Sequence, residues 1–171
     1  MKILMRIALF LVVLAAAGYL YALTIPARQV HTRTVTLKQT PEAIFALLTD
    51  MPNFPKWNRN MEKIEMLPPI DGKEATRQTF KHNMVMTIIT SESTPPKHLV
   101  RSMVDAGGPF EGSWIYDITA MTDGSKIVLT EQSTINSVPF RLMSKIFSPT
   151  KYLDEHLQDI AKQFGESAVV Q

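Results

Sequence analysis

The chain has 171 residues, of which 45% are hydrophobic and 20% charged, and it contains no cysteine. These proportions are typical of a globular protein with one sizeable core and exclude a disordered chain. The absence of cysteine excludes a disulfide framework, a thiolate metal site and a cysteine nucleophile. The net charge of +2 belongs to Lys2 and Arg6, because the rest of the chain has as many basic as acidic residues. A neutral folded part without a run of basic residues argues against a nucleic-acid-binding protein.

An uncharged apolar segment lies near the N-terminus. Residues 7–25 number 19, close to the roughly 20 residues that cross a bilayer as a helix. Secretory signal peptides have shorter apolar cores, followed by small residues at a cleavage site. The AAAG sequence at 15–18 offers such a site, so a cleaved signal remains an alternative. The length of the segment, and Tyr19 and Tyr21 near one end of it, favour an uncleaved anchor over residues 1–27.

The flanking charges predict how this anchor is oriented. Lys2 and Arg6 precede the segment and favour a cytoplasmic N-terminus, although basic residues from Arg28 onward weaken the asymmetry. We therefore expect a single-pass protein of a bacterial inner membrane, with its domain on the periplasmic or extracellular side. The domain is expected over residues 28–166, with 167–171 as a tail.

The folded part begins with a strand and a short helix. Residues 28–38 are rich in β-branched side chains and predict a strand. Thr40 can cap a helix that starts at Pro41, and residues 44–48 supply its apolar stripe. The PNFPKWN sequence that follows holds two prolines, which allow only a turn or one helical turn.

From residue 61 onward the chain has the pattern of successive strands. Thr122-Asp123-Gly124 is the clearest hairpin turn, and Pro68-Pro69 is expected to end the first of these strands. The predicted strands are 63–67, 74–82, 83–93, 97–104, 111–121 and 125–135.

The last segment has the period of a helix. Its apolar positions recur at three- and four-residue steps from Leu142 to Phe164, which predicts a long amphipathic helix. Pro149 lies inside it and predicts a kink or break around Phe147-Ser148. The order of elements predicts an α+β domain with an antiparallel sheet covered on one face by this helix. A curved sheet would leave a cavity beneath the helix.

Residues 40–67 resemble the opening of the START-like helix-grip superfamily, the polyketide cyclase/dehydrase and lipid-transport group of SRPBCC type. The likeness is carried by Pro41-Glu42, the FALLTD sequence at 45–50 and the PKW sequence at 55–57. The hairpin and the leucine-rich last helix fit the same pattern, so the resemblance covers residues 28–166. It implies a curved antiparallel sheet of about six to seven strands around a long C-terminal helix, with two short helices after the first strand. The superfamily contains binders, carriers and enzymes, so the resemblance is specific for fold rather than function.

In this superfamily the two short helices support the long helix and close one end of the cavity. The resemblance thus implies that Phe54, Pro55 and Trp57 form part of a mouth or lid. The alternative, which we favour for Trp57 alone, is that its ring packs the short helices on the sheet.

The histidines do not predict a metal site. His31, His82, His98 and His156 have no second histidine or acid at metal-ligand spacing, so each is expected at the surface or between strands. Gly107-Gly108 stands outside any phosphate-binding loop. We therefore expect no metal and no cofactor.

Glu131 is the main candidate for acid or base chemistry, with Arg101 and Tyr116 as further weak catalytic candidates. Strand alternation places Glu131 on the same face as Leu129. Inside an apolar cavity its pKa would be raised. We favour the alternative that Glu131 lies in water near the open end of the sheet, or pairs with Arg101, because charged groups are seldom buried unpaired.

Methionine is frequent, with 10 residues in the chain. Flexible thioethers line adaptable apolar pockets, and they also fill ordinary cores. The residues predicted to border a ligand cavity are Phe54, Trp57, Phe80, Met84, Met86, Ile88, Met103, Trp114, Tyr116, Ile118, Leu129, Leu142, Ile146 and Leu153.

Three functions fit these observations. We favour a membrane-tethered domain that binds a hydrophobic small molecule or lipid, attached to the membrane through residues 7–25. The second is a cyclase or dehydratase that uses a cavity carboxylate. The third is a non-catalytic accessory domain for protein partners, which would have a filled core and an exposed apolar patch.

Overall fold

The computed structural model describes residues 2–104, 108, 110–146, 148 and 150–171, with Ile146 described by its backbone alone. The helices are α1 (Lys2–Thr24), α2 (Pro41–Thr49), α3 (Phe54–Trp57), α4 (Val138–Ile146) and α5 (Lys151–Gln163), with 3-10 turns η1 (Met51–Asn53) and η2 (Lys81–Asn83). The strands are β1 (Arg28–Leu37), β2 (Met61–Ile70), β3 (Lys73–Phe80), β4 (Met84–Thr94), β5 (His98–Met103), β6 (Phe110–Met121) and β7 (Gly124–Ile135).

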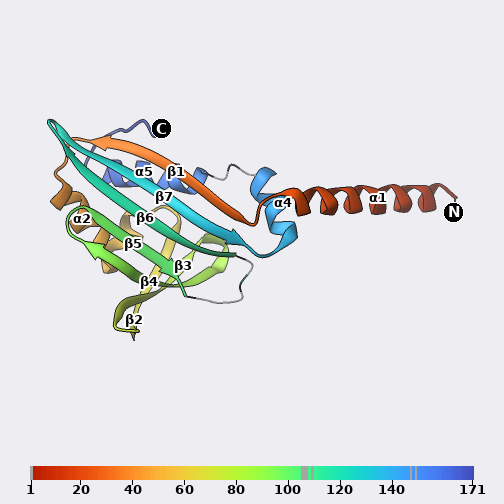
Figure 1. The fold of residues 1–171 in the computed structure, drawn as a ribbon, viewed down its shortest axis with the longest axis horizontal. Helices are drawn as coiled ribbons and strands as arrows, with labels where there is room; N and C mark the ends of the chain where they lie inside the picture. Colours follow the sequence, from red (N-terminus) through yellow and green to blue (C-terminus); the bar gives the residue numbers. More distant parts are fainter. Residues whose placement is uncertain (1, 105–107, 109, 147, 149) are drawn as a thin grey trace.

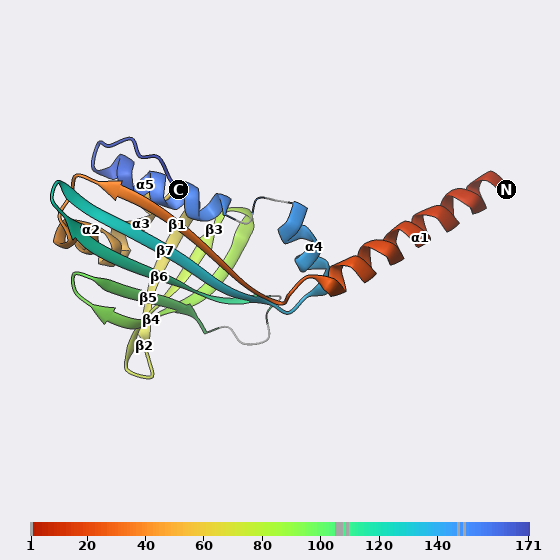
Figure 2. The same ribbon diagram turned by 45° about the horizontal axis from the view of Figure 1, so that its top comes forward.

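The strands form a single antiparallel sheet in the order β1-β7-β6-β5-β4-β3-β2. The sheet curves, α5 lies along one of its faces, and α2 closes the end farthest from α1 (Figures 1 and 2). The α+β class, the strand number and the two short helices after the first strand are confirmed. Strands β2 to β7 form an antiparallel meander, since each pairs with the next, and β1 completes the sheet by pairing with β7.

Strand β2 continues through Pro68-Pro69, where the sequence predicted its end. It is an edge strand, and its register with β3 shifts between Leu67 and Ile70. Proline has no N–H to donate to a neighbour, so it is tolerated at an edge and at such an irregularity.

The C-terminal helix is shorter than the sequence period predicted, because the expected break near residue 148 divides it into α4 and α5. Of these two helices, α5 covers the sheet, and it buries Leu153, Leu157 and Ile160 completely. Helix α4 turns away from the sheet and packs on α1, with Leu142 next to Gly18.

The core has two parts. The larger lies between α2, α5 and strands β1, β5, β6 and β7. The smaller joins η1 and α3 to strands β2 to β4, and its buried members are Met51, Phe54, Met61, Phe80, Met86 and Ile88. Half of these are methionines, whose flexible side chains can repack when a neighbour moves.

Residues after α5 return to the sheet. The backbone N–H of Thr34 donates to the carbonyl oxygen of Gln171 at 2.8 Å, and the N–H of Gln171 donates back at 3.0 Å. The C-terminal segment therefore covers the free edge of β1, and Ala168 and Val170 pack against the larger core.

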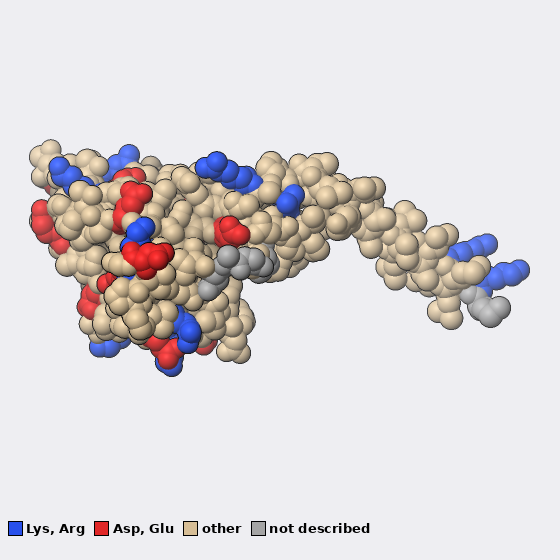
Figure 3. All heavy atoms as spheres, turned by 60° about the horizontal axis from the view of Figure 1, so that its bottom comes forward, with Lys and Arg blue, Asp and Glu red and all other residues tan. Residues whose placement is uncertain are grey.

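Helix α1 projects from the domain as a rod (Figure 2). It is long and apolar enough to cross a membrane, with a mean hydropathy of 2.3 over its most apolar window, none of which is buried. Its surface carries no charged atoms between the basic residues near its free end and the junction with the domain (Figure 3). A signal sequence near the N-terminus can also meet these criteria of length and hydropathy.

The β6–β7 turn provides a test of the predicted hairpin. Gly124 has φ +137°, and an added Cβ would overlap the carbonyl oxygen of Leu37. Gly72, at the β2–β3 turn, has φ +73° with open space around it. We expect Gly72→Ala to lower the free energy of unfolding by about 1–2 kcal/mol, the cost of a left-handed residue. Gly124→Ala should cost clearly more, because the backbone of β1 must also move.

The measurement is unfolding of the full chain in mild detergent, followed by tryptophan fluorescence. Equal losses in the two variants would contradict the close approach of the turn to β1.

Candidate ligand-binding site

The space between the sheet, α5 and the η1–α3 segment contains a small cavity of about 20 Å³. Such a volume holds about one water molecule, so side chains fill most of the interior. The cavity is lined by Met51, Phe54, Gln78, Phe80, Ile88, Arg101, Trp114, Tyr116 and Tyr152.

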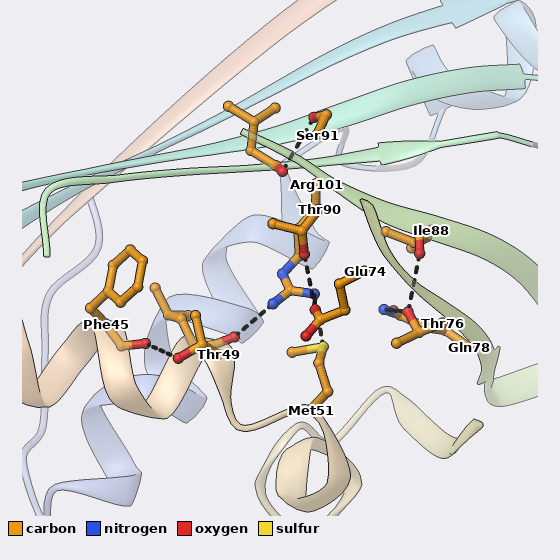
Figure 4. A network of polar contacts seen from close by, with 12 residues as sticks. Phe45, Thr49, Met51, Glu74, Thr76, Gln78, Ile88, Thr90, Ser91 and Arg101 are labelled. Atoms are coloured by element: carbon orange, nitrogen blue, oxygen red, sulfur yellow. Dashed lines mark hydrogen bonds and ion pairs between the residues drawn. The ribbon is translucent and has the colours of Figure 1, made fainter. Parts of the chain in front are cut away.

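Among the described residues of this lining, Arg101 is the one cation. It extends from β5 toward the α2–η1 connection (Figure 4), and it is 5% exposed. Its Nη1 donates to the sulfur of Met51 at 2.8 Å, and its Nη2 donates to the carbonyl oxygen of Leu48 at 3.1 Å. The nearest acid is Glu74, whose carboxylate is 3.8 Å from Nη1 and half exposed. Burial lowers the pKa of Arg101; the group still remains charged.

His156 lies at the centre of the interior, where it is 1% exposed. Its Nδ1 is 3.1 Å from the amide nitrogen of Asn58, and its Nε2 is 3.0 Å from the hydroxyl of Tyr116. Since the Asn58 amide donates, the imidazole carries its proton on Nε2 and donates to Tyr116. Burial lowers the pKa of His156 to about 4. The prediction of a surface or interstrand position is therefore wrong for this histidine.

Aromatic rings surround the imidazole. The ring of Tyr152 stacks on it at a centroid distance of 6.0 Å, and those of Phe54 and Trp57 lie at 5.7 Å and 5.6 Å. The Nε1 of Trp57 is buried without a hydrogen-bond partner among the described residues. Trp57 also packs against both parts of the core, in agreement with the packing role favoured for it.

The segment after α3 is bound to α5 by further polar contacts. Asp159, which is buried, accepts from the backbone N–H and the Nε of Arg59, each at 2.8 Å. Asn60 donates to Glu155 at 2.8 Å. With His156, three side chains of α5 thus hold residues 58–60, which explains why an Asn-Arg-Asn sequence follows the Trp.

A surface groove adjoins the cavity. It measures about 320 Å³ and lies between the N-terminal end of α5 and the β3–β4 connection, with Met84, Lys151 and Glu155 among its walls. Phe80 and Tyr152 line both the groove and the cavity, with their rings 6.2 Å apart. These two rings therefore separate the interior from solvent.

Glu131 occupies a neighbouring, partly buried position on β7. Its carboxylate accepts from Nε1 of Trp114 at 3.0 Å. Burial raises the pKa of Glu131, and the hydrogen bond from Trp114 opposes that rise. The suggested pairing with Arg101 is wrong, because the two groups have separate partners. Glu131 is also outside the cavity lining, which contains the other two catalytic candidates, Arg101 and Tyr116.

The residues predicted to border a cavity fall into five groups. In the lining are Phe54, Phe80, Ile88, Trp114 and Tyr116. Packed in the surrounding core are Trp57, Met86, Met103, Ile118, Leu129 and Leu153. Met84 is exposed on the groove, and the side chain of Ile146 is outside the described part of the chain. Leu142 was wrongly placed, because it lies on α4 against α1.

Sequence reasoning missed Met51, Gln78, Tyr152 and His156. The signal for His156 was present, since it follows Leu153 by three residues and precedes Ile160 by four, within the buried stripe of the helix. Gln78 lies two residues before Phe80 on the same strand, so its side chain points to the same inward face of the sheet. Among the described residues, no group of three or more His, Cys, Asp or Glu side chains is placed to hold a metal ion.

No protein-family model and no curated protein matches this chain. Several solved structures are similar to this chain. The di-domain aromatase/cyclase BexL from the BE-7585A biosynthetic pathway has a TM-score of 0.65 at 11% identity over 82% of this chain, which spans 52% of that protein. The Zhui aromatase/cyclase from Streptomyces sp. R1128 has a TM-score of 0.67 at 12% identity, with 80% of this chain and 93% of that one covered. A START superfamily protein from Mycobacterium smegmatis has a TM-score of 0.62 at 14% identity, with 79% and 98% covered.

The chain has the START-like helix-grip fold. The resemblance inferred from residues 40–67 is thereby confirmed at the level of the fold. Sequence identities of 11–14% show a shared fold and do not show a shared function. In this helix-grip domain, α5 is the gripped helix and the cavity beneath it is nearly filled.

The buried imidazole predicts a pH dependence of stability. Its pKa in the folded chain, about 4, is below the ordinary value of 6.5. Between these values the unfolded chain binds more protons, so stability is complete above pH 6.5 and is lost as the pH falls toward 4. The difference between the two pKa values of His156 corresponds to a loss of about 3 kcal/mol in the free energy of unfolding.

The matched variant is His156→Gln, which does not titrate and offers an amide to both Asn58 and Tyr116. Urea unfolding in mild detergent at pH 7 and pH 4.5 should show a smaller loss in the variant than in the wild type. The same loss in both would mean that His156 is solvated.

Proposed function

We propose that this chain is a membrane-tethered domain that binds a small hydrophobic molecule carrying an anionic group, with Arg101 as the anchor for that group. The observation that carries the proposal is the buried guanidinium in the cavity lining. Its partners are a thioether, a carbonyl oxygen and a carboxylate at 3.8 Å.

The partners of Arg101 compensate its charge poorly. Burying a cation is costly unless hydrogen bonds and a counter-charge replace water. A thioether sulfur is only a weak acceptor, and Glu74 is too distant for a hydrogen bond. A carboxylate or phenolate oxygen in the place of the Met51 sulfur would form a stronger, charge-assisted contact.

The surroundings of Arg101 fit an apolar ligand body. Phe54, Phe80 and Trp114 supply aromatic walls, and Met51 can move because it has a flexible, unbranched side chain. The cavity of about 20 Å³ is too small for a ligand unless it joins the adjacent groove of about 320 Å³. Movement of Phe80 and Tyr152 would connect the two, and their combined space reaches the lower range of small-molecule sites.

The fold supports this proposal at a coarser level. The helix-grip neighbours include aromatase/cyclases and a START superfamily protein. Their shared architecture supports an interior beneath the C-terminal helix as the place where a ring-containing or lipid-like molecule binds.

The tether is the second part of the proposal. Helix α1 has the length and hydropathy of a membrane span, and no residue of its most apolar window is buried. We place the domain on the outer side of a bacterial inner membrane, because Lys2 and Arg6 precede the span. A tether would keep the site near membrane-soluble ligands.

We favour binding over catalysis because of the groups that line the cavity. The cyclase or dehydratase alternative needs a carboxylate among the groups that face the ligand. Within the described residues the cavity lining contains no Asp or Glu, and the carboxylate of the adjoining groove, that of Glu155, accepts a hydrogen bond from Asn60. A bound molecule would meet Arg101, Gln78 and two tyrosines, which can orient it.

The test compares two ligands of the same shape that differ in charge. Titration calorimetry with the full chain in nanodiscs should show that 2-naphthoate binds at least about tenfold more tightly than 2-naphthalenemethanol, as expected for a charge-assisted contact worth more than 1.4 kcal/mol. Arg101→Met should abolish this preference while retaining weak binding of the alcohol.

The control is Arg77→Met, which removes an exposed arginine from β3 and should leave the preference unchanged. Equal affinity of the wild type for both ligands, or loss of the preference in the Arg77 variant, would contradict the role of Arg101.

A further inference from the structure

Helix α4 has an apolar side that does not line the proposed ligand site. Phe140 and Met143 are 48% and 47% exposed, while Pro139 and Leu142 face α1. Ser144, Arg141 and Lys145 occupy the remaining sector of the helix. The helix is therefore amphipathic, with a basic polar side.

The domain fixes α4 in place. The ring of Phe140 stacks on that of Phe110 at 6.4 Å, and Gln29 donates to Ser144 at 3.2 Å. Nε of Arg141 donates to the carbonyl oxygen of Ile135 at 2.9 Å. These contacts make α4 a rigid bridge between the sheet and α1.

The position of α4 along α1 determines its depth in a membrane. Leu142 meets α1 at Gly18, which lies about 9 Å before the end of that helix at Thr24, given a rise of 1.5 Å per residue. The two helices enclose an apolar groove of about 520 Å³ that extends to Leu11. If α1 spans the bilayer, α4 cannot lie wholly in water.

We propose that α4 is an interfacial helix, which inserts Phe140 and Met143 at the boundary between headgroups and acyl chains of the leaflet on the domain side. This inference rests on the tether proposed above. Arg141 and Lys145 then face anionic headgroups together with Arg28 at the start of β1. None of these three cations forms an ion pair within the described residues, so their charges are free for lipid.

A bilayer fits this surface better than a protein partner does. Helix α4 packs on α1 and shares an apolar groove with it, and α1 has no charged residue in its membrane-length apolar stretch. Lipid covers both helices at once, and the combination of aromatic and aliphatic residues with a basic polar side is that of interfacial helices. With α4 in the headgroup layer, the domain is held at a fixed angle to the membrane.

The test uses the absence of cysteine, which gives each variant a single thiol. The full chain carrying Met143→Cys is labelled with an NBD fluorophore and reconstituted into vesicles of phosphatidylcholine and phosphatidylglycerol. Two spin-labelled phosphatidylcholines serve as quenchers, one with the spin label near the start of the acyl chain (the shallow label) and one with the label near its end (the deep label). We expect about twofold quenching by the shallow label, as for a side chain at the headgroup boundary.

Three control variants separate the possible failures. Leu14→Cys reports insertion of α1, Lys145→Cys the polar side of α4, and Lys73→Cys the far end of the domain. The proposal predicts strong quenching at Leu14 by the deep label and at Met143 by the shallow label, with less at Lys145 and none at Lys73. Quenching at Leu14 with Met143 as unaffected as Lys73 would overturn the interfacial helix and leave the tether intact. An unquenched Leu14 label would overturn the tether, and the interfacial helix with it.

Discussion

The hydrogen bonds of one buried histidine join the three layers of this domain. His156 on α5 contacts Tyr116 on the sheet and Asn58 in the short-helix segment. Because the imidazole is neutral, it can satisfy both partners without the cost of a buried charge. The aromatic rings of Phe54, Trp57 and Tyr152 enclose this contact, so the sheet, α5 and α3 share one polar centre within an apolar core.

This constraint makes one side of the interior rigid and leaves the other adaptable. Around His156, polar contacts fix the position of α5. Around Arg101, the packing consists of a methionine-rich cluster with a small cavity and an incompletely compensated cation. A rigid frame next to a deformable, positively charged pocket suits selective binding of an apolar anion, because the frame limits the cost of ordering and the methionines adapt to its shape.

Local patterns predicted most of the fold, and long-range packing decided the site. The sequence predicted the start of α2 at Thr40-Pro41, the hairpin turn at Gly124 and the division between α4 and α5. Each of these depends on the backbone preferences of proline or glycine, which can be seen directly in a sequence. The lining was only partly predictable, because alternation identifies inward-facing residues such as Tyr116 without identifying which of them meet across the interior. Arg101 was expected to pair with Glu131, whereas its hydrogen-bond partners come from the α2–η1 segment, 50 residues away in sequence for Met51. The acid within ion-pair distance is Glu74 on β3. The division between α4 and α5 was visible, yet its consequence, that Leu142 leaves the core, depends on α1.

The most direct test of the central claim is a crystal structure of the domain with 2-naphthoate bound. The account predicts the naphthyl group beneath α5, its carboxylate within hydrogen-bond distance of the Arg101 guanidinium and the Met51 side chain displaced from that position. A structure at saturating ligand in which Met51 still contacts Arg101, with the naphthoate on the surface, would contradict it.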